Sequence, residues 1–120
     1  MLIMPIKRKW LEMIRSGEKK EEYRDIKPYY TSRIRNLITA SPWMDGRTIE
    51  EIKAAGDKGV RFEDVVLRGG YDRFAPAIRI SGTITIGTGK PEWGAEPNRK
   101  YFIFRIESVE EFLTNRKAIT

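Results

Sequence analysis

The chain has 120 residues, of which 40% are hydrophobic and 33% are charged, a composition that fits one globular domain over residues 1–120. It has no cysteine and no histidine, which excludes disulfides, thiolate or imidazole metal sites and serine–histidine–acid triads. No apolar run approaches the roughly 20 residues that cross a bilayer. We therefore expect a cytoplasmic protein without a metal, a cofactor or a membrane partner.

The net charge of +6 is unevenly distributed along the chain. Residues 1–35 hold ten Lys or Arg against five Asp or Glu, and the remaining residues are nearly neutral. A basic N-terminal third attracts nucleic acid, nucleotide phosphates or another anionic surface. A solvated surface without any partner explains the same charge equally well.

The first third of the chain predicts a strand, a helix and a second strand. Residues 1–6 read as a strand, with Pro5 near a sheet edge or the strand end. Apolar residues at helical spacing predict a helix over Lys7–Ser16, and Gly17 suits its left-handed cap. A strand is predicted over Lys19–Ile26. These elements form the opening of a mixed α and β chain.

The middle of the chain predicts further helices. Residues Tyr29–Leu37 form the next amphipathic helical pattern. Turn signals mark residues 39–58 as an insertion between sheet elements. Within it, Thr48–Ala55 reads as a helix whose first residue is the cap, with Glu51 completing a capping box.

The second half is rich in predicted strands, over Val60–Leu67, Ala77–Ile86 and Tyr101–Glu107. Gly82 interrupts the alternating apolar series of the middle strand and predicts a bend or bulge. A short helix is predicted over Val109–Leu113. The pattern as a whole predicts an α+β fold, a small mixed β-barrel, closed or nearly closed, with two to four short helices around it.

The segment Gly17–Arg24 concentrates residues that carry chemistry. Lys19 can act as a nucleophile or base if burial or a neighbouring cation lowers its pKa, although on sequence statistics alone an exposed strand lysine is the more frequent case. Glu22 and Arg24 lie two apart and share one strand face. They form either a structural ion pair or an acid/base with a cation that holds phosphate or carbonyl. Lys19 reaches Glu22 only from a turn or an irregular strand.

Three further positions are candidates for ligand contacts. In the Gly69–Arg73 loop, Tyr71 can stack on a base and Arg73 can contact phosphate. Trp93 lies in a loop where an aromatic ring is either a packed cover or a stacking platform. Lys7 is either a ligand contact near Lys19 or a surface lysine at a helix start.

The spacing Gly-x-Lys-x-x-Glu-x-Arg in Gly17–Arg24, preceded by residues 6–14, resembles the signature of the ASCH domain. In the opening segment, Arg8 stands where that family commonly has proline. The resemblance implies a PUA-like barrel that binds RNA, a nucleotide or a nucleoside in a cleft lined by the motif. It assigns ligand contacts to Lys7, Lys19 and Arg24, and the loop aromatics Tyr71 and Trp93, with Arg73, support them.

The same resemblance implies an alternative activity. Some small ASCH proteins are amidohydrolases that remove acyl groups from N4-acylated cytidine with the motif lysine, a threonine and a glutamate, and others are linked to ribonuclease activity. Here Glu22 stands in place of that threonine. The sequence does not identify the remaining acid, although Glu63 and Asp64 lie in a strand region that could face the cleft. The first hypothesis is therefore a binding module, and the alternative is a hydrolase that uses Lys19 and Glu22. A protein-interaction domain is a third possibility, and the oligomeric state is open.

Overall fold

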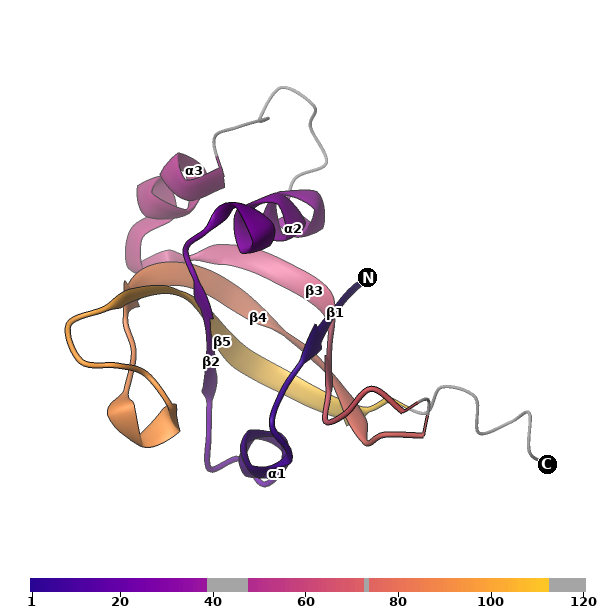
Figure 1. Cartoon of the computed structure of the whole chain (residues 1–120). Coiled ribbons are helices and arrows are strands. Elements are labelled where there is room, and N and C mark those ends of the chain that lie inside the picture. The colour runs from indigo at the N-terminus through magenta and orange to yellow at the C-terminus, as the bar shows by residue number, and fades with distance from the viewer. Residues whose placement is uncertain (39–47, 73, 113–120) are drawn as a thin grey trace.

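The computed structural model describes residues 1–38, 48–72 and 74–112 (Figure 1). Within them the chain forms five strands, three α-helices and two short 3-10 turns. In chain order these are β1 (Leu2–Pro5), α1 (Arg8–Arg15), β2 (Glu21–Asp25), α2 (Pro28–Ile38), α3 (Thr48–Ala55), η2 (Gly56–Lys58), β3 (Val60–Arg68), β4 (Ala77–Thr88), η3 (Pro91–Trp93) and β5 (Lys100–Glu111). No helix in the described part of the chain is long and apolar enough to span a bilayer.

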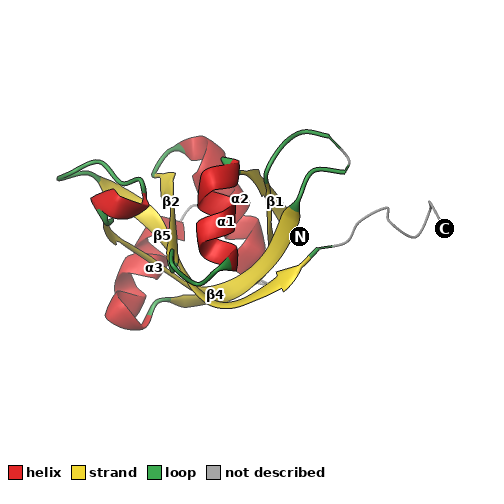
Figure 2. Ribbon diagram, turned by 90° about the horizontal axis from the view of Figure 1, so that it is seen from below, coloured by secondary structure: helices red, strands yellow, loops and turns green. Residues whose placement is uncertain are grey.

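The strands form one mixed sheet in the order β1-β3-β4-β5-β2. β1 runs parallel to β3, and the other neighbouring pairs are antiparallel. The sheet curls strongly, so the fold is a half-barrel with helices on its concave side and at its ends (Figure 2). Its two edge strands, β1 and β2, are the first two strands of the chain. The α+β class predicted from the sequence is confirmed at this level.

Two irregularities bend the long strands. The β3–β4 register shifts between Phe62 and Val65, and the β4–β5 register shifts at Gly82. A Cβ atom built at Gly82 would lie 1.8 Å from the carbonyl oxygen of Arg105, so only glycine allows β5 to approach this closely. The predicted bulge at Gly82 is confirmed, and it gives the sheet the curvature that a half-barrel needs.

The core fills the concave side of the sheet. Alternate residues of β4 and β5 point into it, among them Ile80, Ile84 and Phe104, each at most 1% exposed. The helices contribute the remaining apolar contacts, with Leu11 and Ile14 from α1 buried at one end. One helix residue each from α2 and α3 is buried in the same cluster. The α1 end is the one that carries the motif.

A second, smaller apolar cluster lies on the other face of the sheet. Tyr101 and Ile103 of β5 pack there with Ala95, and Tyr23 of β2 packs against them. Ala95 belongs to the connection between β4 and β5, and we name residues 89–95 the strap (orange, lower left in Figure 1). This cluster holds the strap beside the β2 edge.

Two local predictions were wrong. Val109 lies in β5, which runs to Glu111, because the long β4 continues to supply backbone partners as far as Ile78. Strand pairing therefore replaces the predicted helix, whose last residue, Leu113, lies outside the described residues. The predicted helix at Thr48–Ala55 forms, but Thr48 is already helical, and its buried hydroxyl has no hydrogen-bond partner among the described residues. The expected capping box is therefore not made.

Candidate functional site

The motif begins in the turn between α1 and β2. Gly17 adopts a positive φ of 87°, and the Lys19 amide donates to the Met13 carbonyl oxygen at 2.9 Å, which closes the turn against the helix. β2 starts only at Glu21. Lys19 therefore precedes the strand, and its side chain is free of the strand alternation that would have separated it from Glu22.

The Lys19 ammonium is fully buried and has three acceptors. Its Nζ donates to the Glu21 carbonyl oxygen at 2.6 Å and to the Trp93 carbonyl oxygen at 2.9 Å. It also forms an ion pair with the Glu22 Oε1 at 3.1 Å, and the Lys19 side chain is 0% exposed. An ammonium has three donors, so its hydrogen-bonding capacity is used completely inside the protein.

Glu22 links this lysine to Arg24. Its second oxygen, Oε2, accepts from Arg24 Nη2 at 2.5 Å. The same guanidinium donates to the Pro5 carbonyl oxygen at 2.9 Å and to the Tyr30 hydroxyl at 3.3 Å. Arg24 thus bridges β2, the end of β1 and α2, across the open side of the half-barrel. We name Lys19, Glu22 and Arg24 the buried charge cluster.

The electrostatics of the cluster follow from its burial. Desolvation lowers the pKa of Lys19, while the Glu22 carboxylate acts in the opposite direction. Desolvation also acts to lower the pKa of Arg24, but Glu22 and Tyr30 outweigh it, so that pKa is raised. Arg24 therefore stays charged at any physiological pH, and one carboxylate serves two buried cations.

A groove opens beside the cluster, at the start of α1. It has a volume of about 370 Å³ and is lined by Pro5, Ile6, Lys7, Arg8, Gly69, Gly70 and Tyr71. We name it the basic groove. Arg8 Nε donates to the Gly69 carbonyl oxygen at 3.0 Å. This bond joins the two segments that line the groove, residues 5–8 and 69–71. Lys7 is exposed, and the Tyr71 side chain is 91% exposed.

The groove and the buried charge cluster meet at Pro5. The groove is lined by Pro5, and the carbonyl oxygen of this residue accepts from Arg24. Lys7 and Lys19 lie beyond opposite ends of the eight-residue α1, which spans about 12 Å. Lys7 therefore belongs to the groove, and Lys19 belongs to the cluster.

The remaining predicted contact residues fall elsewhere. Trp93 contacts the cluster through its carbonyl oxygen, and Lys90 Nζ lies 4.5 Å from the centre of its ring. Trp93 belongs to the strap and does not line the groove that Tyr71 lines. Arg73 lies outside the described residues.

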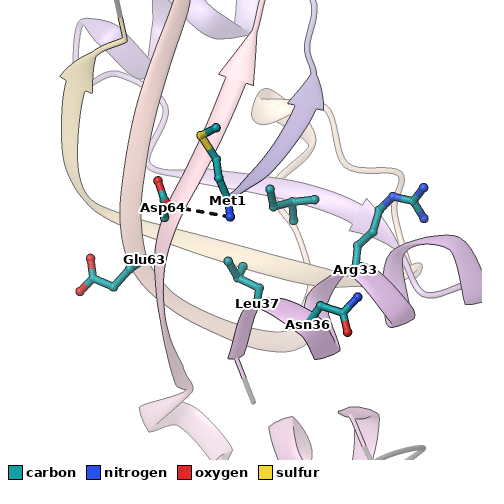
Figure 3. A pocket seen from close by; sticks show the side chains of 7 residues that line it. Met1, Arg33, Asn36, Leu37, Glu63 and Asp64 are labelled. Carbon is teal, nitrogen blue, oxygen red and sulfur yellow. Dashed lines mark ion pairs between the residues drawn. The ribbon is translucent and has the colours of Figure 1, made fainter. Parts of the chain in front are cut away.

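Glu63 and Asp64 lie in a different pocket, of about 380 Å³ (Figure 3). Asp64 forms ion pairs with the Met1 amine at 3.8 Å and with Arg79 at 3.2 Å, and Glu63 points away (Figure 3). The β1–β3 register puts this pocket at the start of β1, whereas Arg24 contacts its end. Neither acid joins Lys19 and Glu22. Across the described ranges, no three carboxylates gather into a possible metal site.

The aromatic neighbours of the cluster were missed by the sequence analysis. The ring centres of Tyr23 and Trp10 lie 4.9 Å and 5.3 Å from Lys19 Nζ, and Tyr30 contacts Arg24. A Cβ built at Gly94 would lie 3.2 Å from Trp10, so the strap rests directly on this ring. No local spacing links the strap, at residues 89–95, to α1, so only folding reveals the contact.

Comparison of the chain with models of protein families, with curated protein sequences and with solved structures gave no match.

Proposed function

We propose that this chain is a PUA-like domain of the ASCH type that binds single-stranded RNA or a nucleotide in the basic groove. The observation that carries the proposal is the lining of the groove. It combines the cations of Lys7 and Arg8 with the exposed ring of Tyr71, and no carboxylate of the described residues lines it. The curled mixed sheet is compatible with a small barrel of this kind.

The roles in the groove follow from the exposure of each side chain. Lys7 contacts phosphate, because it is exposed and forms no ion pair among the described residues that would neutralise it. Tyr71 stacks on a base, because almost its whole side chain is exposed. Arg8 holds the Gly69 wall in place and adds positive charge. Lys19 and Arg24, by contrast, are buried supports of the groove wall.

The test is the affinity for a fluorescein-labelled single-stranded RNA, measured by anisotropy over a range of salt concentrations. We expect the affinity to fall as salt rises, and Lys7→Glu to weaken binding. The matched control is Lys58→Glu, an exposed lysine that precedes β3, whereas the groove lies beyond the far end of that strand. No binding at low salt, or equal loss in both variants, would overturn the proposal.

A hydrolase is the second candidate, and the 3.1 Å contact between Lys19 and Glu22 favours it. The two groups that the alternative requires do converge, although burial keeps them from substrate in this conformation. The test is turnover of N4-acylated cytidines by the wild-type protein and by Lys19→Ala, with Lys20→Ala as the control. Activity that survives in a folded Lys19→Ala protein, or no turnover by the wild type, would remove this candidate.

A further inference from the structure

The three acceptors of the Lys19 ammonium differ in origin. The Glu21 carbonyl and the Glu22 carboxylate belong to β2, next to Lys19 in the chain. The third acceptor, the Trp93 carbonyl oxygen, comes from the strap, 74 residues away. Displacement of the strap therefore removes one acceptor and leaves the other two in place.

Besides the bond to Lys19, the strap contacts Trp10 of α1, Tyr23 of β2 and the small outer cluster. The Lys90 amide donates to the Tyr23 hydroxyl at 3.0 Å, and Ala95 packs in the small outer cluster. None of its residues belongs to the buried main core of the half-barrel. Gly89 begins the strap, and Gly94 takes a positive φ of 101°, so glycines stand near both ends. Opening of the strap would therefore break contacts to Lys19, Tyr23 and Trp10 but none within the main core.

Beneath the strap, the Lys19 ammonium lies among two aromatic rings and a carboxylate. The ring centres of Tyr23 and Trp10 lie 4.9 Å and 5.3 Å from its Nζ, and the Glu22 carboxylate lies 3.1 Å away. One N–H of the ammonium points to the Trp93 carbonyl. Because Glu22 is anionic, a neutral carbonyl oxygen fits this position better than a phosphate oxygen does. The strap itself supplies such an oxygen.

We propose that residues 89–95 form an autoinhibitory lid, in which the Trp93 carbonyl occupies the hydrogen-bonding position on Lys19 that a carbonyl oxygen of a ligand takes when the lid opens. The lid is independent of the proposed binding in the basic groove, because Trp93 and its neighbours do not line that groove. Each proposal can fail without the other.

The first test is amine labelling of the native protein, with Lys19 and the exposed Lys20 quantified by mass spectrometry. We expect Lys19 to react more slowly than Lys20, at a rate nearly independent of low urea concentrations, because local opening exposes little surface. A Lys19 rate that rises with urea as steeply as global unfolding would overturn the lid.

Two glycine variants test whether displacement of the strap exposes Lys19. A Cβ at Gly89 would lie 2.7 Å from Ala95 and from the Tyr23 ring, whereas one at Gly87 would lie 3.5 Å from Ile103, an ordinary contact. We expect Gly89→Ala to raise the labelling rate of Lys19 about tenfold. Gly87→Ala should leave it unchanged, and Lys20 should be unaffected in both variants. Equal rates in the two variants would contradict the proposal.

The ligand class is tested in the Gly89→Ala protein with two small probes. N-methylacetamide offers a neutral carbonyl oxygen, and inorganic phosphate offers an anionic one. We expect N-methylacetamide to slow the labelling of Lys19 and phosphate to leave it unchanged. Protection by phosphate alone, or by neither probe, would overturn the assignment to a carbonyl ligand.

Discussion

The buried charge cluster and the basic groove are adjacent, but their charged groups differ in exposure to solvent and in internal pairing. In the cluster, the Lys19 side chain is 0% exposed, and all three of its donors are used. In the groove, Tyr71 is 91% exposed, and Lys7 is exposed as well. The two regions share Pro5, whose carbonyl is held by Arg24.

Because the motif is buried and the groove is exposed, the most distinctive segment of the sequence need not be the surface that binds a ligand. The cluster joins the two edges of the half-barrel through Arg24 and Pro5, so we expect it to stabilise the fold in this conformation. The groove is formed by less distinctive residues, but its donors and its aromatic ring remain open to an external partner. Variants of the cluster should therefore change stability, and variants of the groove should change binding.

The largest expected effect is on stability, from Glu22→Gln. This change leaves two buried cations, Lys19 and Arg24, without their shared carboxylate. We expect the free energy of unfolding to fall by about 3–5 kcal/mol. Urea denaturation followed by circular dichroism measures it, and Glu18→Gln, at an exposed position, is the control with a change within about 0.5 kcal/mol. A similar, small change in both variants would contradict the structural role.

The next effect comes from Arg24→Lys. Lysine keeps the charge but lacks the planar group that reaches Pro5, Glu22 and Tyr30 together. We expect a loss of about 1.5–3 kcal/mol in unfolding free energy, in the range for hydrogen bonds to charged groups. The same denaturation experiment measures it beside Arg61→Lys, which alters an exposed arginine. Equal stability of the two variants would show that the bridge contributes nothing.

In the groove, Tyr71→Ala should act on binding alone. Loss of one stacking ring is expected to weaken RNA binding by about 1–3 kcal/mol, or roughly 5- to 150-fold. The melting temperature should hardly change, because the side chain is 91% exposed. Anisotropy measures the affinity, and Tyr29→Ala, on α2, serves as the control. A Tyr71→Ala protein that binds like the wild type would exclude stacking at this position.

The smallest effect is a pH dependence. Because burial lowers the Lys19 pKa below its ordinary 10.5, the unfolded chain holds more protons here than the folded one between the two values. The unfolding free energy contributed by Lys19 should therefore rise with pH in this window. It is measured as the difference between wild type and Lys19→Met, in which other groups cancel, and it stays below about 1.4 kcal/mol per pH unit. A difference that falls with pH would reverse the sign of the shift.

Several elements were predictable because their signals are local. Apolar residues at helical spacing located α1, and strict alternation located β4, including the bulge at Gly82. The end of β5 was not predictable, because its pairing with β4 overrides the local helical pattern at Val109. Short-range propensity is weak against a row of backbone partners that is already in place.

For the candidate site, the sequence by itself determined which charged residues lie together near the start of β2, since Lys19, Glu22 and Arg24 are close in the chain. It also determined the basic character of the first third and the aromatic residue after Gly69-Gly70. Those properties depend on composition and short spacing, which folding does not alter. The burial of the motif and the exposure of the groove depend on tertiary contacts. The reason is that burial depends on the strap and β1, which are distant in sequence and reach the motif through backbone carbonyls that no residue type encodes.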